Sequence, residues 1–593
     1  MASSEPPPPA QTFAYEDDLP RLPVPPLPST CDRFLEWVEP LLTDDELTQT
    51  RYAMQEFRSD AGIGKQLQEL LVRHDRTPGR ATWADEFFHQ RYFGRRTPVA
   101  INANYFFLFQ SHPGIGQLQR AARLVNATLQ FKQRVDDETL APVTRRGQPM
   151  SMEQYKYLFS ATRIPGEPLD SSRAPYTSEW PGPSRERHIL VLHQGHAVTL
   201  DVLDENGTPY DVDEVETGLR AAVRACEDDT NGEWVGAFTT SDRPRWARNR
   251  QALIDAGNDE ALDRVERALF CVCLDDVAPS SATQACDQLL HGNRENRWFD
   301  KAVSFIVAAD GTAGFNGEHC RLDGTTVVGF LDVVLTATPA PSTGRDRHPR
   351  AEPVTFQTTP HLREELRAAR ASFDVEAAAT LGVALAVDFS ATRAKLLGVS
   401  PDAFAQLAFQ LANFRATGEV GSTYESIATT GYRHGRTEAM RVVTPQSVKF
   451  VQCMDKPGVG DDERRNAFRA AAEQHGRRAA QCRAGDAPEQ HLWELLMTHQ
   501  RRRSGAIALF ESPGWAIARD DRLSTSAVPS PHVSYWGFGP TNEQCLGVGY
   551  ALLPDTFHLY ISARHSQARR LSDFVTELPR VVEQIEELLR DHR

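Results

Sequence analysis

The chain has 593 residues, with 65 lysines and arginines against 80 aspartates and glutamates, and a formal net charge of -15. Such an acidic chain is not expected to bind nucleic acid as its main partner, because nucleic-acid-binding proteins present basic surfaces. A chain of this length favours two large domains over one. The longest apolar runs, such as 381–387, are too short to cross a bilayer, so no membrane partner is expected.

The nine cysteines follow no zinc-ligand spacing and no Cys-x-x-Cys pattern. We also find no signal peptide and no C-terminal address for the endoplasmic reticulum or the peroxisome. Together these features predict a reduced, cytoplasmic protein with no bound metal.

The N-terminal quarter of the chain reads mainly as helix. Residues 1–14 contain a run of four prolines and are predicted to form a disordered tail. The proline-rich stretch 19–27 is predicted to be extended, since proline restricts both its own backbone and that of the residue before it. Ser29 and Thr30 are then expected to cap a helix, and helical patterns continue to about residue 140.

Strand signals follow in the second quarter. Residues 187–201 alternate toward strand, and 205–207 is typical of a hairpin turn. Residues 302–307 are predicted to form a buried strand that ends at the turn Asp310-Gly311. The Pro- and Arg-rich stretch 338–349 is the best linker in the chain, and we expect the two halves to meet there.

Helices and strands also alternate in the second half. We predict helices at 360–373, 401–415 and 463–500, an amphipathic helix near the C-terminus, and strands at 505–510, 531–538, 546–553 and 557–563. The glycines of 547–550 suggest that another backbone packs closely there. The chain is therefore predicted to be α/β or α+β in two halves.

His319 is the most informative residue of the chain. It is expected near the end of a strand that returns from 302–307, four residues before Asp323-Gly324, which would turn the chain and support the imidazole. A neutral imidazole is well suited to take a hydroxyl proton near pH 7. The same pattern also occurs around histidines that have no catalytic role, so by itself it is weak evidence for catalysis.

Eight motifs occur in one order along the chain: Leu118–Leu124, Asn296–Lys301, Glu318-His319, Ser400–Phe404, Thr423–Ser426, Gly435–Thr437, Leu523–Ser526 and Gly537–Pro540. In this order they resemble the choline/carnitine O-acyltransferase family over nearly the whole chain. The resemblance implies two similar α/β domains of the CoA-dependent acyltransferase type, each a mixed sheet flanked by helices, with an active-site tunnel at their interface. The expected boundaries are 15–70 for an N-terminal helical segment that packs with the C-terminal domain, 71–350 for the N-terminal domain and 351–593 for the C-terminal domain.

The resemblance also implies the chemistry. His319 would remove the proton of the acceptor hydroxyl, so that its oxygen attacks the acyl-CoA thioester directly, with Asp323 supporting the imidazole. Ser526 would donate a hydrogen bond to the tetrahedral oxyanion. Because no acyl-enzyme is expected, Cys320 would only pack. CoA or acetyl-CoA is then a co-substrate, no cofactor is tightly bound, and a monomer is expected.

The resemblance places the CoA site at Arg393, Lys395 and Asp402. Arg393 and Lys395 would form a cationic patch for the 3′-phosphate, although one of the two family positions falls on Ala391. The acyl pocket would contain Trp536, where family members that accept long chains have glycine. An indole at that position would fill the tunnel and favour acetyl or another short acyl group.

The acceptor site would comprise Tyr424, Ser426, Thr437, Arg91, Ser524 and Phe538. Here the chain departs from the family, because the arginine that binds the carnitine carboxylate is replaced by Gln490. Arg91 could supply a guanidinium from the opposite wall, or it could point to solvent. Phe538 would face the trimethylammonium group of the acceptor.

These features predict an acyl-CoA-dependent enzyme that transfers short acyl groups reversibly between CoA and carnitine or a close analogue. Because of Gln490, an acetyltransferase for choline or another quaternary amino alcohol is the alternative. An inactive protein that keeps the fold is a further alternative, although both His319 and Ser526 are present.

Overall fold

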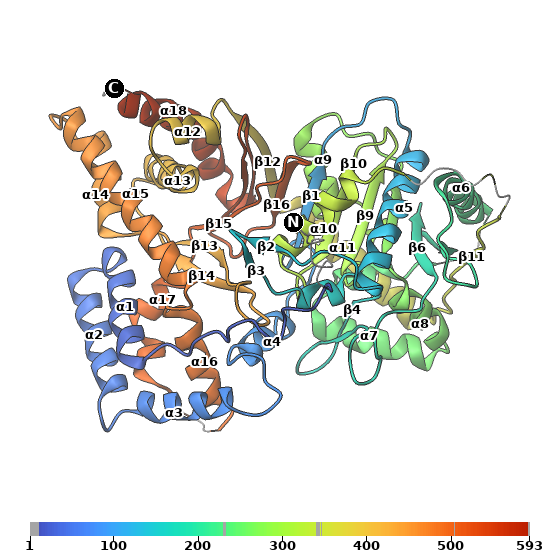
Figure 1. Ribbon diagram of the computed structural model, residues 1–593, viewed down its shortest axis with the longest axis horizontal. Helices are drawn as coiled ribbons and strands as arrows, with labels where there is room; N and C mark the ends of the chain where they lie inside the picture. The colour runs from blue at the N-terminus through green and yellow to red at the C-terminus, as the bar shows by residue number, and fades with distance from the viewer. Residues whose placement is uncertain (1–10, 229–232, 340–343, 345–346, 503–504, 591–593) are drawn as a thin grey trace, which may run out of the picture. The chain divides into compact units, whose positions relative to one another are not determined.

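The computed structural model describes residues 11–228, 233–339, 344, 347–502 and 505–590 (Figure 1). The chain forms two compact units, and each is assembled from separate segments. The first unit comprises the described residues up to Pro20, Tyr92–Ala377 and Thr430–His434. The second comprises Arg21–Arg91, Ala378–Thr429 and the described residues from Gly435 onward.

The first unit is built on a mixed sheet whose strands run in the order β11-β7-β6-β8-β9-β10-β1. Its central pairings, β6 with β8 and β8 with β9, are parallel, and the outer pairings are antiparallel. The strands of this sheet are β1 (Asn104–Phe109), β6 (His188–His193), β7 (His196–Asp201), β8 (Cys271–Asp275), β9 (Val303–Ala308), β10 (Ala313–Glu318) and β11 (Ala351–Pro353). Two short pairs lie apart from it: β2 (Thr144–Arg145) with β3 (Gln148–Pro149), and β4 (Thr162–Ile164) with β5 (Ser171–Arg173).

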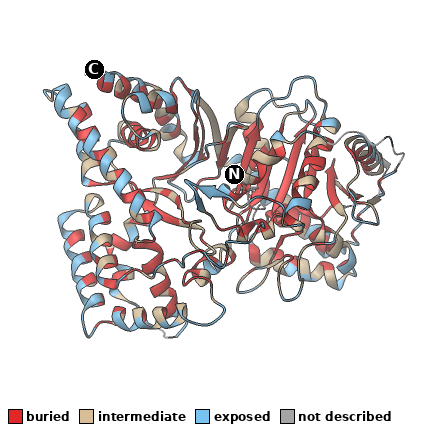
Figure 2. Ribbon diagram, in the orientation of Figure 1, coloured by how far each residue is buried: buried red, intermediate tan, exposed pale blue. Residues whose placement is uncertain are grey.

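Helices cover both faces of this sheet. The helices of the first unit are α5 (Gln117–Asp136), α6 (Val212–Asp228), α7 (Arg243–Asp255), α8 (Asp259–Arg267), α9 (Ala282–Leu290), α10 (Gly324–Thr336) and α11 (Pro360–Ala378). On one face, Phe305 of β9 pairs with Phe315 of β10 and contacts Phe330 of α10, with 6.3 Å between the Phe305 and Phe330 ring centroids. On the other face, Gly314 lies against Leu289 of α9. The core strands are accordingly buried on both sides (Figure 2).

The second unit contains a mixed sheet in the order β12-β18-β17-β15-β13-β14. Again the central pairings, β17 with β15 and β15 with β13, are parallel, while the outer ones are antiparallel. The strands of the unit are β12 (Thr380–Val387), β13 (Thr423–Ala428), β14 (Thr437–Arg441), β15 (Leu523–Ala527), β16 (Val533–Phe538), β17 (Leu546–Leu552) and β18 (Phe557–Arg564).

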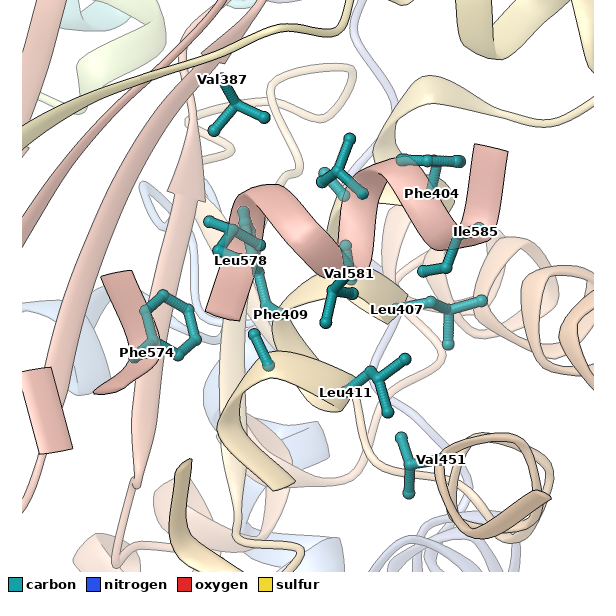
Figure 3. Packing of buried hydrophobic residues seen from close by; sticks show 14 of the residues in the cluster. Val387, Phe404, Leu407, Phe409, Leu411, Val451, Phe574, Leu578, Val581 and Ile585 are labelled. Atoms are coloured by element: carbon teal, nitrogen blue, oxygen red, sulfur yellow. The ribbon is translucent and has the colours of Figure 1, made fainter. Parts of the chain in front are cut away.

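The core of the second unit lies between its sheet and the helices α13 and α18, which pack side by side (Figure 1). In the later part of the unit the helices are α12 (Ala391–Leu396), α13 (Pro401–Thr417), α14 (Pro445–Asp455), α15 (Asp461–Arg483), α16 (Glu489–Gln500), α17 (Pro513–Ile517) and α18 (Ala568–Arg590). Figure 3 shows how Phe409 and Leu411 of α13 meet Phe574, Leu578 and Val581 of α18. All five side chains are fully buried. The three-to-four spacing of apolar residues predicts this for α18, whereas α13 is buried on all sides from residue 403 to residue 413.

Three N-terminal helices also belong to the second unit, and a fourth begins there: α1 (Leu27–Val38), α2 (Asp44–Arg58), α3 (Ile63–Asp75) and α4 (Asp85–Phe93). Polar contacts hold them against the C-terminal helices. The Thr30 hydroxyl lies 2.7 Å from Nδ1 of His491 in α16, and the Arg478 guanidinium of α15 lies 4.9 Å from the Trp37 ring centroid. The helices from α1 to α3 are thus part of the unit that ends the chain.

Several elements differ from the sequence prediction. The predicted run of helix up to residue 140 is wrong at β1, whose six residues are all buried. Tertiary burial decides this segment, because a short aromatic run is compatible with either structure. The strand pair β6–β7 turns at Gln194-Gly195, both with positive φ, a turn that was not predicted. The predicted turn at 205–207 is present and lies between the bridged residues Leu203 and Pro209. Residues 508–511 form a 3₁₀ helix instead of the predicted strand, and α1 begins at Leu27, ahead of the predicted caps.

The predicted disordered tail and the predicted linker are described only in part. Of the tail predicted to be disordered, residues 1–10 lie outside the described residues, whereas Thr12–Asp18 form turns and the buried Thr12 donates to the Leu140 carbonyl. Of the predicted linker, 340–343 and 345–346 lie outside the described residues. The first unit continues through α11 to Ala377, because Arg370 pairs with Glu295 at 2.8 Å in that unit.

The predicted fold class is confirmed: the chain is a mixed α/β protein with two large mixed sheets flanked by helices. Among the described residues, no helix combines the length and the apolar character that are needed to cross a membrane.

Candidate active site

His319 follows directly after strand β10 in the first unit. Its side chain is 33% exposed, and its Nδ1 lies 2.8 Å from the backbone carbonyl of Leu322. A carbonyl oxygen can only accept a hydrogen bond, so Nδ1 carries the hydrogen. In the neutral ring the lone pair then lies on Nε2, which is the nitrogen able to take a proton.

The aromatic rings of two tyrosines surround this imidazole. The ring centroid of Tyr92 is 4.9 Å from that of His319, and the ring centroid of Tyr105 is 5.2 Å from it. Tyr105 comes from β1, the strand that pairs with β10, and it is almost fully buried. These contacts fix the plane of the imidazole and leave it partly accessible.

Asp323 lies close to His319 but does not form the predicted turn. Its Oδ1 is 3.6 Å from His319 Nδ1, too far for a hydrogen bond but close enough to stabilise a protonated ring. Gly324 is the first residue of α10, so the chain continues as helix after Asp323 instead of turning back. The side chain of Gln154 holds Asp323 from two sides, donating to Oδ2 at 2.9 Å and accepting from the backbone N–H at 2.7 Å.

The thiol beside the histidine is not activated. Burial, followed by the carboxylate of Glu318, raises the pKa of Cys320 well above its usual value. Glu318 accepts from the Cys320 backbone N–H at 3.0 Å and pairs with Arg163 at 3.1 Å. A thiol that stays protonated is a poor nucleophile.

In the second unit, the predicted acceptor residues gather on one face of the sheet. Strand pairing sets Tyr424 of β13 beside Ser524 of β15, and Ala428 beside Thr437 of β14. Because side chains alternate along a strand, the following residues share this face: Tyr424, Ser426, Thr437, Ser524 and Ser526. All but Ser524 are half-buried, whereas the opposite face of β13 is buried. We call this set the hydroxyl face.

Hydroxyl contacts connect the hydroxyl face. The Oγ atoms of Ser426 and Ser526 are 2.9 Å apart. Gln490, which replaces the arginine of the family pattern, donates from its side-chain amide to the backbone carbonyl of Thr437. Gln490 thus stabilises strand β14, and one hydrogen of its side-chain amide is committed to that carbonyl.

Strand β16 passes close to the two glycines of β17, as the spacing of glycines predicted. A Cβ on Gly549 would lie 2.4 Å from the carbonyl oxygen of Trp536, and one on Gly547 would meet the Phe538 ring at 3.3 Å. Trp536 is 5% exposed, and its indole N–H donates to the Tyr550 carbonyl at 2.9 Å. Its ring centroid lies 5.7 Å from that of the half-buried Phe538.

The two predicted cations of the CoA site differ in their ion pairs and exposure. Arg393, on α12, pairs with Asp388 at 2.8 Å and also with Glu586. Hydrogen bonding to Glu586 raises the pKa of Arg393, and its charge is balanced by these two carboxylates. Lys395, one residue beyond Ala394 on the same helix, is exposed.

Asp402, in the first turn of α13, belongs to a buried polar cluster. The Tyr550 hydroxyl donates to its Oδ1 at 2.7 Å, and His475 Nε2 lies 3.1 Å from its Oδ2. Burial would raise the pKa of Asp402, but these partners outweigh burial and lower it. Burial, then the charge of Asp402, raises the pKa of Glu425 well above its usual value.

Within the described residues, Asp402, Glu425 and His475 are the one group that could hold a metal ion, with ligand atoms within 4.8 Å of one another. Hydrogen bonds to Tyr550 and His475 already satisfy both oxygens of Asp402. The raised pKa of Glu425 disfavours the charged carboxylate that a metal ion would need as a ligand. We therefore assign no metal to this cluster.

Arg91, on α4, lies near acidic side chains of the second unit. Its charge lowers the pKa of both Glu438 and Asp521, against the larger effect of burial, which raises both. The guanidinium is 5.7 Å from the Phe87 ring centroid. A second arginine, Arg441, is buried on the strand that carries Thr437 and is neutralised by Glu489 and Asp521.

Sequence reasoning did not identify Gln154, Tyr92, Tyr105, Gln406 or Thr525 as parts of these sites. Gln154 and Asp323 are separated by 169 residues, and Gln406 and Thr525 by 119. No local pattern marks such pairs, because their contacts arise from the tertiary fold. Only Thr525 had a signal, its place between the two serines of Leu523–Ser526.

Solved structures with a partial likeness to this chain include a trichothecene 15-O-acetyltransferase from Fusarium sporotrichioides, with a TM-score of 0.36 and 10% identity over 84% of this chain and 93% of that one. The condensation enzyme VibH has a TM-score of 0.34 and 12% identity, over 85% of this chain and 95% of that one.

Curated relatives align over almost the full length. Carnitine O-acetyltransferase of Columba livia is 32% identical over 613 residues, which cover 99% of this chain and 94% of the relative. The rat enzyme of the same name is 31% identical, over 98% of this chain and 94% of the relative. Mitochondrial carnitine O-palmitoyltransferase 2 of Mus musculus is also 31% identical, over 93% of this chain and 89% of the relative.

The sequence pattern described as Choline/Carnitine o-acyltransferase matches residues 22–580. The match includes both units, with the histidine after β10 and the hydroxyl face. By this match and the full-length relatives, the chain belongs to the choline/carnitine O-acyltransferase family.

Proposed function

We propose that this protein transfers a short acyl group, acetyl in the first instance, reversibly between CoA and the hydroxyl of carnitine or a close analogue. His319 takes the proton of the acceptor hydroxyl, and the acceptor oxygen attacks the thioester carbonyl directly. The new C–O bond gives a tetrahedral intermediate. The C–S bond breaks as this intermediate collapses, and the proton passes from His319 to the CoA thiolate. No acyl-enzyme is formed.

The hydrogen bond from His319 Nδ1 to the Leu322 carbonyl is the observation on which this proposal depends. It keeps the basic lone pair on Nε2, the nitrogen that a general base must present to its substrate. Asp323, 3.6 Å away, favours the protonated ring after the proton has been taken. The protonated Cys320 supports direct transfer over a thiol nucleophile.

The hydroxyl face supports the remaining roles. Ser526 donates its hydroxyl hydrogen to the oxyanion of the tetrahedral intermediate and accepts one from Ser426, 2.9 Å away. Removing one oxyanion donor typically lowers kcat by about 10²–10³. Tyr424, Thr437 and Ser524 contact the acceptor on the same face, and Phe538 faces its cationic group.

The acyl group is short because of Trp536. Its indole is almost fully buried and is anchored to strand β17 by the hydrogen bond to Tyr550. Substitution to glycine is expected to admit medium-length chains. We expect the ratio of kcat/KM for octanoyl-CoA to that for acetyl-CoA to rise in Trp536→Gly, and to stay low in the control Trp536→Phe.

For the 3′-phosphate of CoA we propose Lys395 in place of Arg393. Lys395 is exposed, whereas two carboxylates neutralise Arg393. The KM for acetyl-CoA is therefore expected to rise more in Lys395→Ala than in Arg393→Ala. The nine cysteines, all buried thiols, support action in a reducing compartment such as the cytoplasm.

A second candidate acceptor is choline or another quaternary amino alcohol. It is favoured by Gln490, which donates to the backbone of β14 where the family pattern has a carboxylate-binding arginine. The two candidates differ in whether the acceptor carries a carboxylate. Arg91 is the cation proposed to meet that carboxylate.

The test is a panel of acceptors that includes carnitine, choline and their short homologues, with release of CoA thiol from acetyl-CoA as readout. Carnitine is expected to support turnover, and His319→Ala is expected to abolish it while the matched surface variant His361→Ala does not. Turnover with choline but not carnitine would select the second candidate. A His319→Ala protein as active as the parent would exclude both.

The role of Arg91 is tested on the same assay. Arg91→Ala is expected to raise the KM for carnitine without a matching change in the KM for acetyl-CoA. An unchanged KM for carnitine would remove Arg91 from the acceptor site.

A further inference from the structure

A buried chain of hydrogen bonds lies beneath the hydroxyl face, and the proposed function does not use it. At its centre is Gln406 of α13, a fully buried side chain. Its Nε2 lies 2.8 Å from Oγ1 of Thr525 and 3.1 Å from the Tyr550 hydroxyl. One amide thus bonds to two neighbouring strands, β15 and β17.

The direction of every hydrogen in this chain follows from its ends. The Thr525 hydroxyl lies 2.8 Å from the Tyr424 carbonyl, which can only accept, so Thr525 donates there. The Tyr550 hydroxyl donates to the Asp402 carboxylate at 2.7 Å. Each hydroxyl has then used its single hydrogen and must accept from Gln406, so both amide hydrogens of Gln406 are committed.

This arrangement fixes which way the amide of Gln406 points. Its Oε1 is buried and has no hydrogen-bond partner among the described residues. An orphaned acceptor is costly, yet the flipped amide would set its oxygen against two hydroxyl oxygens whose hydrogens are already used. The fold therefore holds Gln406 as a double donor.

Thr525 connects this buried chain to the hydroxyl face. It lies between Ser524 and Ser526 on β15, and its side chain points to the opposite side of the sheet. Holding Thr525 to both α13 and β13 fixes the pleat of the strand at this point. The direction of the neighbouring Ser526 hydroxyl, 2.9 Å from Ser426, depends on that pleat.

We propose that Gln406 is a positioning residue for Ser526, acting through the hydroxyl of Thr525. The proposal rests on the proposed function, because Gln406 would orient the Ser526 hydroxyl, which is the proposed oxyanion donor. Gln406 touches neither substrate, so its loss should lower kcat with little change in the KM for acetyl-CoA.

The same helix offers a matched control. Gln410, one turn along α13 and also buried, donates to the Thr423 hydroxyl at 3.0 Å. This hydrogen bond anchors the start of β13, whereas the bond of Gln406 to Thr525 anchors the strand that carries Ser526. Gln410→Met is therefore expected to lower stability as Gln406→Met does and to change kcat by less than about 2-fold.

The experiment is a double-mutant cycle between Gln406→Met and Ser526→Ala, measured as kcat with acetyl-CoA and the best acceptor of the panel. In the parent background, Gln406→Met is expected to lower kcat by about 2- to 12-fold, the range of one neutral hydrogen bond. In the Ser526→Ala background the same change is expected to lower kcat by less than about 2-fold, because the group that Gln406 positions is gone.

Two substitutions of Thr525 test the proposal independently if Gln406→Met does not fold. Thr525→Val replaces the hydroxyl by a methyl group and should lower kcat as Gln406→Met does, whereas Thr525→Ser keeps the hydroxyl and should restore kcat to within about 2-fold of the parent. Equal losses of kcat in both backgrounds of the cycle, or equal losses in the valine and serine variants, would overturn the proposal.

Failure of the proposed function gives a different result. If the parent released no thiol with any acceptor, both that function and the positioning role would be rejected. An active parent with an additive cycle would reject the positioning role alone.

Discussion

Replacing Gly549 by alanine tests how closely β16 must approach β17. The added Cβ would lie 2.4 Å from the Trp536 carbonyl oxygen, 2.9 Å from the Gly537 Cα and 3.1 Å from the Trp536 carbonyl carbon. All three are backbone atoms, so no side-chain rotation can relieve the contact. Strand β16, which carries Trp536 and Phe538, would have to move away from the sheet.

The size of the movement follows from these distances. Non-bonded heavy atoms rest at roughly 3.5 Å, so the strand must shift by about 1 Å. Overpacking of this kind typically costs about 1–3 kcal/mol of unfolding free energy. For a unit of this size that corresponds to a fall in Tm of about 2–12 °C. Because the indole of Trp536 would move with the strand, we also expect kcat/KM for acetyl-CoA to fall.

The assay compares Gly549→Ala with Gly476→Ala by thermal unfolding of the full chain and by thiol release. Gly476 lies exposed within α15, and a Cβ there would meet nothing within 4 Å. Alanine in a helix interior is worth about 0.5–1 kcal/mol over glycine, so the control should gain stability. If Gly549→Ala were as stable and as active as Gly476→Ala, the close approach of β16 would be refuted.

Three further predictions follow from the contacts of single side chains. Because burial and Glu318 raise the pKa of Cys320, Cys320→Ala should keep kcat within a few-fold of the parent, and no acyl-protein should be detected by mass spectrometry; a loss of about 100-fold would argue for a thiol step. Gln154→Leu removes the two hydrogen bonds that the Gln154 side chain makes to the buried Asp323. The free energy of unfolding in denaturant should therefore fall by roughly 1–3 kcal/mol, and kcat should fall as well. Unchanged values would show that Gln154 does not support His319. Burial raises the pKa of Glu438 from 4.5 to about 8, so the folded chain holds a proton that the unfolded chain releases, and stability should fall as pH rises between these values by about 1.4 kcal/mol per unit. Glu438→Gln removes this dependence, so its advantage over the parent should grow from pH 5 to pH 8; a constant difference would contradict the raised pKa.

Much of the site could be predicted from short stretches of sequence. Ser524 and Ser526 were named from the motif Leu523–Ser526, but the strand β15, which sets both side chains on one face, was not predicted. The glycines at 547 and 549 predicted a close backbone, and β16 lies there. His319 was expected at the end of a returning strand, and β10 ends one residue before it.

Other features depended on contacts that no local pattern contains. The short aromatic strand β1 was taken for helix, because its run of five apolar residues satisfies either period until burial on both faces selects the strand. Asp323 was expected in a turn, but it precedes α10 and is held by Gln154 from 169 residues away. Arg393 was expected to meet a phosphate, yet Glu586, 193 residues later, already pairs with it.

The amino-acid sequence by itself therefore determined the mixed α/β class, the family and the long amphipathic helix at the C-terminus, together with some of the strands. These depend on periodicity, glycine spacing and short motifs, all of which act over a few residues. The tertiary structure alone decided which nitrogen of His319 is basic, which arginines are already neutralised, and how Gln406 holds the strand of Ser526. Those properties arise from hydrogen bonds and charges between segments far apart in the sequence, from 48 residues for Arg441 with Glu489 to 193 for Arg393 with Glu586, or from a backbone carbonyl whose direction only the folded chain sets.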